Sequence, residues 1–476
     1  MTKQQFYELL VNSFQFQPTQ SQWELFEKWV RFLASSDQLE IFLLNGYAGT
    51  GKTSSVNALV LAIAQTRMKT VLLAPTGRAA KVLSAYTSKN AFTIHKHIYF
   101  SSNEDGDGFQ FRVQTNKYVN TLFIVDEASM ISSGNKGEEW MGRNLLDDLM
   151  QYVYGGDKCK LLFIGDQAQL PPVGETESVA LQTKYFETHF GFRVHQHELT
   201  DVVRQSEDSG ILFNATWLRQ LLDLPKEIKS IPTFRLSGFK DVVRISMSDE
   251  LEDKLQSAYS KYGDEEVLII CRSNKQAIRY NFEIKARIKY SDDLINSNDL
   301  LMVVKNNYHW LDKKDGFLAN GEVLRVERVG RRETMYGFDF AQLSLTWFDG
   351  TTEKSIDAKV LLSTMQSEST GLSQQEWKTM LAAAKESYGF MPKYKMMAEL
   401  RKDPYLNALQ VKLAYAVTCH KAQGGQWKCV FIDQGYLTEE MINQEYIRWL
   451  YTAVTRATEQ LYLVNFNDRF FEDSDI

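Results

Sequence analysis

The stretch that decides the fold is IFLLNGYAGTGKT at residues 41–53, where a short apolar run leads into a glycine-rich loop and then into a helical pattern. Residues 46–53 complete the pattern G-x-x-x-x-G-K-[ST]. In such a loop the glycines let backbone N–H groups surround phosphate oxygens, a lysine reaches the β- and γ-phosphates, and a hydroxyl ligates Mg²⁺. The loop therefore predicts a site for ATP and Mg²⁺, with contacts from Gly46, Gly49, Thr50, Gly51, Lys52 and Thr53.

Short apolar runs alternate with helical patterns in two parts of the chain. Such runs are typical of buried parallel strands, and their alternation with helices predicts a doubly wound α/β sheet. The first part holds the runs 41–46, 70–75, 121–127 and 160–166, and the second holds 265–273, 412–421, 428–434 and 460–466. We therefore expect two α/β lobes, each with a parallel sheet.

The pattern changes between residues 296 and 410. Apolar and polar residues alternate around Gly and Asp turns over 323–329 and 341–362, which predicts a small antiparallel β module inserted into the second lobe. The expected organisation is a first lobe over 1–184, a second lobe over 185–295 and 411–476, and an inserted β-rich module with a helical extension over 296–410.

A second acidic motif supports the nucleotide site. The apolar run of TLFIVDE (121–127) ends in Asp126 and Glu127. A carboxylate at a strand end can hold Mg²⁺, here Asp126 together with Thr53, and the next one can orient or deprotonate an attacking water. The alternative is a strand that simply ends in two solvated acids. The upstream phosphate loop favours the catalytic interpretation.

Charge and composition exclude several classes of protein. The formal net charge of −6 excludes a uniformly basic surface, although a local positive groove is enough for nucleic acid. The 4 cysteines make neither a disulfide framework nor the paired spacing of a zinc site. The polar N-terminus is unlike a signal peptide, and no apolar stretch approaches the ~18 residues of a membrane span. We therefore expect a reduced, soluble, cytoplasmic protein.

Further polar motifs follow the later strands and helices. Arg204 and Arg456 are candidate arginine fingers, because a planar guanidinium suits the charge that develops on a transferring phosphoryl group. The alternative for each is an arginine in a surface ion pair. The motifs are GDQAQLPPV (165–173), LTDVVRQ (199–205), TCHKAQGGQW (418–427) and YTAVTRA (451–457).

The order of these motifs resembles that of superfamily 1 helicases, and most of all the RecD-like and Dda-like DNA helicases. The resemblance runs from about Thr19 to Leu463 and also covers APTGRAA (74–80) and TIHK (93–96). It implies two RecA-like lobes of the P-loop NTPase type. It also implies a small β-hairpin, called the pin, at about 97–115, and an SH3-like fold for the inserted module.

The resemblance also implies roles for single residues. Gln169 would sense the γ-phosphate, while Arg204 and Arg456 would reach it from the second lobe. Gln22 would read adenine, although Thr19-x-x-Gln22 is also a helix capping box. Contacts to single-stranded DNA would come from Pro75, Thr76, Thr93, His95, Thr418, His420 and Gln423. The family usually has serine where Ala422 stands, so one DNA contact is not carried over.

Two aromatic-rich segments are candidates for strand separation or strand contact. The pin holds Tyr99, Phe100, Phe109 and Phe111, which either stack at a fork or merely hold the hairpin to its lobe. The stretch 388–405 interleaves aromatic and basic residues, which is consistent with a strand-contacting surface or with a solvated helix face.

These features together predict an ATP hydrolase that acts as a DNA helicase and moves 5′→3′ on single-stranded DNA, a direction implied by the resemblance alone. The alternatives are a single-strand translocase that displaces proteins, an RNA helicase of the same superfamily, and a non-catalytic nucleotide switch. The expected partners are single-stranded DNA, single-strand/duplex junctions, and single-strand-binding or repair proteins. We expect a monomer that does not contact membranes.

Overall fold

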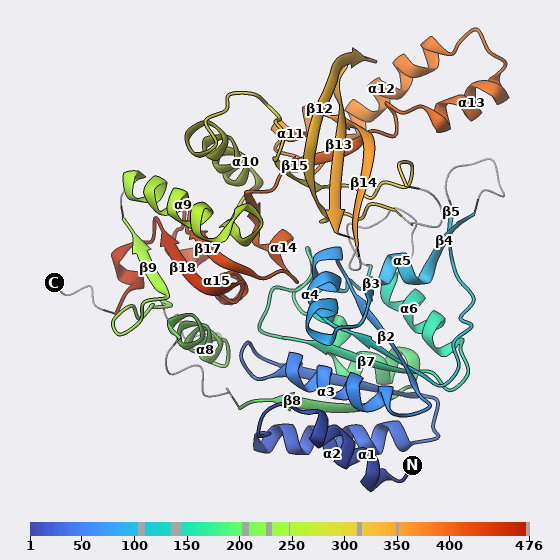
Figure 1. The fold of residues 1–476 in the computed structure, drawn as a ribbon, viewed down its shortest axis with the longest axis vertical. Helices are drawn as coiled ribbons and strands as arrows, with labels where there is room; N and C mark the ends of the chain where they lie inside the picture. The colour runs from blue at the N-terminus through green and yellow to red at the C-terminus, as the bar shows by residue number, and fades with distance from the viewer. Residues whose placement is uncertain are drawn as a thin grey trace.

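The computed structural model describes residues 1–102, 110–134, 144–201, 209–224, 231–246, 248–311, 317–348 and 352–472. Figure 1 shows three bodies: a first lobe at the bottom, a second lobe at the left and a β barrel at the top. Among the described residues, no helix is long and apolar enough to cross a membrane. Each of the four cysteines is buried as a free thiol.

The first lobe is built on a six-stranded parallel sheet of order β3-β2-β6-β7-β1-β8. Apolar side chains lie on both of its faces, which explains the continuous apolar runs of the central strands. The strands are β1 (Glu40–Gly46), β2 (Lys69–Ala74), β3 (Ala91–Thr93), β6 (Thr121–Val125), β7 (Lys160–Gly165) and β8 (Arg193–Leu199).

Helices cover both faces of this sheet. One hydrophobic cluster joins it to the N-terminal helices and to the helices that follow β1 and β2, and a second cluster joins the opposite face to α6. The helices are α1 (Lys3–Ser13), α2 (Gln20–Ala34), α3 (Lys52–Ala64), α4 (Gly77–Thr87), α5 (Ile94–Ile98), α6 (Leu145–Tyr154) and the short α7 (Thr183–Tyr185).

The boundary predicted between residues 184 and 185 is wrong, because β8 pairs with β1 over Glu40–Arg193 to Gly46–Leu199 and completes the first sheet. Polar residues interrupt β8, and its burial pattern is mixed, as is typical of an edge strand. The apolar-run criterion therefore missed it.

The second lobe is a five-stranded parallel sheet of order β16-β10-β17-β18-β9. Its strands are β9 (Val242–Ile245), β10 (Val267–Cys271), β16 (Ala416–Thr418), β17 (Trp427–Asp433) and β18 (Ala457–Val464). Its helices are α8 (Gly210–Leu222), α9 (Ser248–Tyr262), α10 (Asn274–Glu283), α14 (Cys419–Ala422) and α15 (Gln444–Val454). The mixed α/β class with parallel sheets is confirmed.

The inserted module is a closed barrel of five strands. These are β11 (Leu300–Val303), β12 (Val323–Met335), β13 (Phe338–Phe348), β14 (Glu353–Leu361) and β15 (Leu409–Leu413). Helices α11 (Ser363–Gln366), α12 (Gln374–Ser387) and α13 (Lys393–Lys402) lie between β14 and β15, and α12 and α13 extend away from the barrel (Figure 1). The SH3-like assignment of this barrel stays a prediction.

The expected boundary at 410/411 falls inside β15, so the insert ends after Leu413. The run 412–421, predicted as one strand, is in fact divided. Its start closes the barrel, Ala416–Thr418 forms β16 of the second sheet, and α14 follows at once. A continuous apolar run cannot reveal such a division, because the strands of both bodies are buried.

A two-stranded antiparallel hairpin occupies the position predicted for the pin. It consists of β4 (Tyr99–Ser102) and β5 (Gln110–Val113). The Tyr99 hydroxyl donates to Asp148 of α6 at 2.7 Å, which holds the hairpin to its lobe, whereas Phe100 is 46% exposed. Phe109 and the side chain of Phe111 lie outside the described residues.

Candidate nucleotide site and lobe interface

The phosphate loop takes its shape from its glycines. It leaves β1 at Gly46 and enters α3 at Lys52, and Gly49 and Gly51 have φ values of 79° and 83°. Side chains disfavour this left-handed conformation, which glycine adopts freely. A Cβ on Gly46 would lie 2.9 Å from Thr50 Oγ1 and 3.2 Å from Leu199 Cβ. Gly49 and Gly51 are therefore required by the backbone conformation, and Gly46 by the close approach of neighbouring side chains.

The side chain of Lys52 is held in place by backbone carbonyl groups of the phosphate loop. Its Nζ donates to the Gly46 oxygen at 2.5 Å and to the Tyr47 oxygen at 2.9 Å. The side chain of Thr53 is exposed in the first turn of α3. The loop thus places an ammonium group and a hydroxyl together at a helix N-terminus, where phosphate binding is favoured.

Gln22 closes a capping box and also supports the phosphate loop. Its Oε1 accepts from the Thr19 backbone N–H at 3.0 Å, and the Thr19 side chain caps α2 in return. Its Nε2 donates to the Thr50 carbonyl at 3.2 Å. The side chain is only 1% exposed, so it supports the phosphate loop from the interior of the lobe. Its role toward adenine stays a prediction.

Asp126 and Glu127 follow β6 directly at the same edge of the sheet. Asp126 is fixed by the Tyr86 hydroxyl at 2.7 Å and by the Glu127 N–H at 2.9 Å. Glu127 has φ 52°, a conformation that costs a non-glycine residue about 1–3 kcal/mol. Burial raises the pKa of Glu127 and Asp126 adds to this, while the cations of Arg456 and Lys52 oppose it.

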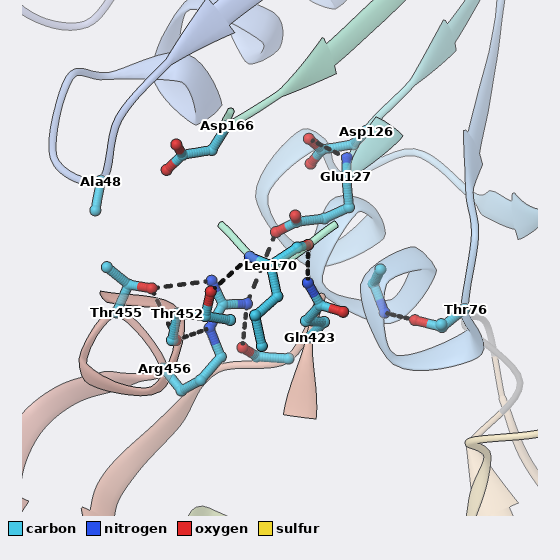
Figure 2. A network of polar contacts seen from close by, with 12 residues as sticks. Ala48, Thr76, Asp126, Glu127, Asp166, Leu170, Gln423, Thr452, Thr455 and Arg456 are labelled. Carbon is cyan, nitrogen blue, oxygen red and sulfur yellow. Dashed lines mark hydrogen bonds and ion pairs between the residues drawn. The ribbon is translucent and has the colours of Figure 1, made fainter. Parts of the chain in front are cut away.

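Arg456 brings a positive charge from the second lobe to this carboxylate. Its Nη1 lies 3.9 Å from Glu127 Oε1, and the arginine is 3% exposed (Figure 2). The guanidinium also donates to the Thr452 and Gly425 carbonyls, both at 3.1 Å, and to Thr455 Oγ1 at 3.2 Å. Because these bonds fix its position, the charge is preorganised. Arg204, the other candidate finger, lies outside the described residues.

Gln169 is the remaining predicted residue of the nucleotide site. Its side chain is 5% exposed, and its Oε1 has no hydrogen-bond partner among the described residues. Asp166, at the start of the same loop, accepts from the Ala168 N–H at 2.9 Å and from the Tyr451 hydroxyl at 2.5 Å. A buried amide oxygen without a partner is costly, so a bound water or ligand at Gln169 would relieve that cost.

Two of the four predicted DNA contacts of the first lobe are N-terminal caps of helices. Thr76 Oγ1 accepts from the Ala79 N–H of α4, and Thr93 Oγ1 accepts from the Lys96 N–H of α5, both at 3.2 Å. Pro75 is half-buried beside the first cap. Burial lowers the pKa of His95 to about 4, so this imidazole is neutral at pH 7. Their contacts to DNA stay predictions.

The predicted contacts of the second lobe divide into two groups. Thr418 and His420 are half-buried around α14, and burial lowers the pKa of His420. Gln423 is only 5% exposed, and its Nε2 donates to the Leu170 carbonyl of the first lobe at 2.6 Å. The structure therefore places Gln423 between the lobes rather than on an open surface. The DNA contacts of Thr418, His420 and Gln423 stay predictions.

A cavity of about 470 Å³ lies where the two lobes and the barrel meet. Its wall includes Phe92 and Thr93 from the first lobe, Phe348 from the barrel and Trp427 from the second lobe. Lys81 lies 5.1 Å above the Phe348 ring. Aromatic rings next to cations are the groups that hold single strands without reading their sequence.

Two family models match the chain, one for each lobe. The AAA domain model covers residues 18–220, and the UvrD-like helicase C-terminal domain model covers 413–464. Over both lobes the chain is similar to superfamily 1 helicases. This confirms the resemblance stated from the motifs, and the RecD-type relatives below agree with it.

The curated relatives of the chain are distant. Uncharacterized protein R530 of Acanthamoeba polyphaga mimivirus is 23% identical, covering 89% of this chain and 94% of the relative. RecBCD enzyme subunit RecD of Buchnera aphidicola is 21% identical over 91% of this chain and 71% of the relative. ATP-dependent DNA helicase dda of Enterobacteria phage T4 is 31% identical, over 34% of each chain. A solved Bacteroides Pif1 helicase in complex with ADP-AlF3 and ssDNA has a TM-score of 0.45 and 15% identity, covering 96% of this chain and 94% of that one.

Two residues at the nucleotide site were missed by sequence analysis. The Ala48 N–H of the phosphate loop donates to the Tyr451 hydroxyl at 2.9 Å, and Tyr451 in turn donates to Asp166. Arg219 of α8 lies 3.5 Å from the centre of the Tyr47 ring. Tyr451 begins the motif YTAVTRA and could have been singled out there. Arg219 belongs to no motif, so only the three-dimensional structure reveals it.

Proposed function

We propose that this superfamily 1 chain hydrolyses ATP between its two lobes and uses the cycle to move 5′→3′ on single-stranded DNA and to unwind duplex. The observation that carries the proposal is the approach of Arg456 Nη1 to Glu127 Oε1 at 3.9 Å, beside the phosphate loop. The two residues come from different lobes, so the site is complete only when the lobes are together. Hydrolysis is thereby linked to movement between the lobes.

Each residue of the site has a definite task in this proposal. Lys52 leaves the carbonyls of Gly46 and Tyr47 and moves to the phosphate oxygens. Thr53 and Asp126 would hold Mg²⁺, which neutralises phosphate charge, and a hydroxyl with a carboxylate suits that ion because Mg²⁺ keeps several water and phosphate ligands. Glu127 orients the attacking water and takes up its proton.

Two further residues act on the charge that develops during hydrolysis. Gln169 directs its free amide oxygen at the attacking water or its amide nitrogen at the γ-phosphate. Arg456, and Arg204 with it, stabilises the negative charge that builds up on the transferring phosphoryl group. Because Arg456 is already fixed by three hydrogen bonds, little reorganisation is needed when the charge appears.

The proposal of DNA as the substrate rests on a second set of features. The wall of the cavity between the lobes and the barrel has aromatic side chains together with both cations and carboxylates, and it includes Thr93, one of the predicted strand contacts. The relatives of the chain include a RecD subunit and a phage DNA helicase. Strand separation is assigned to the hairpin β4–β5, whose Phe100 is exposed.

Glu127→Gln tests the hydrolysis step. The substitution keeps the size of the side chain but removes the base, so we expect ATP turnover to fall about 10²–10⁴-fold. ATP binding should remain within a few-fold of the parent protein, as measured by equilibrium binding of a fluorescent ATP analogue. Unchanged turnover would indicate a nucleotide switch whose chemistry does not depend on this carboxylate.

Paired duplexes with a 5′ or a 3′ overhang test the mechanical part. We expect ATP-dependent unwinding of the 5′-overhang duplex only. Unwinding of the 3′-overhang duplex alone would reverse the proposed direction, and full ATPase without unwinding would favour a translocase. ATPase stimulation by single-stranded RNA but not by DNA would contradict the choice of DNA.

A further inference from the structure

The loop that follows β7 in the first lobe inserts into the second lobe. Ala168 and Leu170 are 5% and 2% exposed, and both side chains belong to the hydrophobic core that contains Leu218 and Leu450 of the second lobe. Gln169, the predicted γ-phosphate sensor, stands between them. This segment, residues 166–170, therefore connects the nucleotide site to the interior of the opposite lobe.

The backbone of Leu170 is held from both sides by the second lobe. Its N–H donates to Thr452 Oγ1 of α15 at 2.8 Å, and its carbonyl accepts from Gln423 Nε2 at 2.6 Å (Figure 2). A weaker contact joins Arg448 Nη1 to the Gln169 carbonyl at 3.4 Å. The segment cannot shift without breaking at least one of these bonds or carrying the second lobe with it.

Gln423 is the residue through which such a shift would reach α14. It follows the last residue of that helix directly, and its N–H donates back to the His420 carbonyl at 3.4 Å. Thr418 stands at the N-cap position of the same short helix, without a side-chain capping bond. One side chain therefore spans the distance from Leu170, next to Gln169, to the helix that carries two predicted DNA contacts.

We propose that Gln423 is a positioning residue that couples the nucleotide state sensed at Gln169 to the grip of α14 on single-stranded DNA. The inference rests on the proposed helicase function and deepens it. Gln423 is buried and its amide is already engaged, so it acts through Leu170 and α14 rather than by touching DNA. Such a coupling is a free energy shared by the two sites, and it is therefore reciprocal.

Gln423→Met tests this coupling, because methionine keeps the length of the side chain but cannot donate a hydrogen bond. The affinity for fluorescein-labelled oligo-dT is measured without nucleotide and with a non-hydrolysable ATP analogue, and the affinity for the analogue is measured with and without oligo-dT. Each pair of measurements gives a ratio, the affinity with the second ligand divided by the affinity without it. In the parent protein both ratios should differ from one by the same factor. In Gln423→Met both ratios should move toward one, by about 3–10-fold, a loss within the usual range of coupling energies.

Two controls separate coupling from a general structural effect. Gln375→Met, on the exposed face of α12, should leave both ratios unchanged. Thr452→Val removes the other bond to Leu170 and should reduce the same two ratios, so the test survives if Gln423→Met fails to fold. Affinity for oligo-dT without nucleotide should stay within about twofold in each variant, because no DNA contact is removed.

The possible outcomes are distinct. Weaker oligo-dT binding without nucleotide, at unchanged ratios, would show that Gln423 touches DNA and would overturn the inference. Unchanged ratios together with unchanged affinities would also overturn it, while the proposed helicase function would stand. Failure of the parent protein to bind oligo-dT or to hydrolyse ATP would instead overturn the proposed function, and the inference with it.

Discussion

Glu127 is held in an unfavourable state on two counts. Its backbone is in the left-handed region at φ 52°, and its half-buried carboxylate lies beside Asp126, with the nearest cation, Arg456, 3.9 Å away. A group placed only for stability would be expected to avoid both costs. Strain and a perturbed pKa at the same residue are typical of a catalytic position.

The raised pKa of Glu127 leads to a prediction for the pH profile of ATP hydrolysis. The carboxylate must be ionised to take up a proton, and a raised pKa means that it protonates at a higher pH than the ~4.3 of an ordinary glutamate. As pH falls, kcat/KM should therefore decline well before that value. The measurement is steady-state ATPase from pH 5 to 8, with circular dichroism to confirm folding. An acid limb at the ordinary glutamate value would contradict the assignment.

Arg456→Lys tests whether hydrolysis depends on the positive charge alone or also on the fixed geometry of the guanidinium. Lysine keeps the positive charge, but it cannot make the fixed guanidinium bonds to Thr452, Gly425 and Thr455. We expect kcat to fall by about 10²-fold or more, toward the 10³–10⁵-fold range of arginine fingers, with KM for ATP changed only a few-fold. Arg279→Lys, an exposed residue of α10 that pairs only with Glu283 among the ion pairs of the described residues, is the control. A parallel rise in KM with constant kcat would indicate a binding role only.

At the scale of elements, the lobes meet where the turn after α14 packs on the start of α4. Arg78 lies 3.8 Å from the centre of the Trp427 ring and donates to the Gln426 carbonyl at 2.8 Å. A Cβ on Gly425 would lie 2.5 Å from Trp427 Cη2 and 2.7 Å from Cζ3. Close packing around this glycine therefore brings the indole and the guanidinium into contact.

Gly425→Ala should disturb this packing. Because the added methyl overlaps the indole, we expect a loss of about 1–3 kcal/mol in the free energy of unfolding, measured by urea denaturation. Trp427→Phe removes the two overlapping ring atoms, so the double variant should lose less than the sum of the single variants, by an amount that a double-mutant cycle reports. Strictly additive effects would show that the overlap is relieved elsewhere.

Sequence patterns predicted the elements of the site better than their contacts across the lobes. The phosphate loop, the strand ending in Asp126 and the capping box at Gln22 depend on neighbours in the chain, and the structure contains all three. The bond from Gln423 to Leu170 joins residues 253 positions apart, and β8 pairs with β1 across a separation of 153, from Glu40 to Arg193. No local periodicity encodes such pairs, so the predicted lobe boundary is wrong and the contact of Gln423 with the first lobe was not foreseen.

For the molecule as a whole, a net charge of −6 is compatible with DNA binding when the contacts are mostly uncharged. The predicted strand contacts are threonines, a proline, histidines and a glutamine, and His95 is neutral at pH 7 because burial lowers its pKa to about 4. The cavity between the lobes and the barrel adds aromatic rings, with Lys81 as a cation close to one of them. Few phosphates are therefore neutralised by fixed positive charge.

This arrangement predicts a shallow dependence of DNA affinity on salt. If about two to four phosphates are neutralised, the logarithm of the association constant for oligo-dT should fall with the logarithm of salt concentration at a slope of about −1.5 to −3. Fluorescence anisotropy between roughly 50 and 200 mM salt gives this slope. The slope should be the same at pH 6 and pH 7, because the pKa of His95 of about 4 lies below both. A slope near −7, as expected for about ten phosphate contacts, would instead require a basic track that the present assignment lacks.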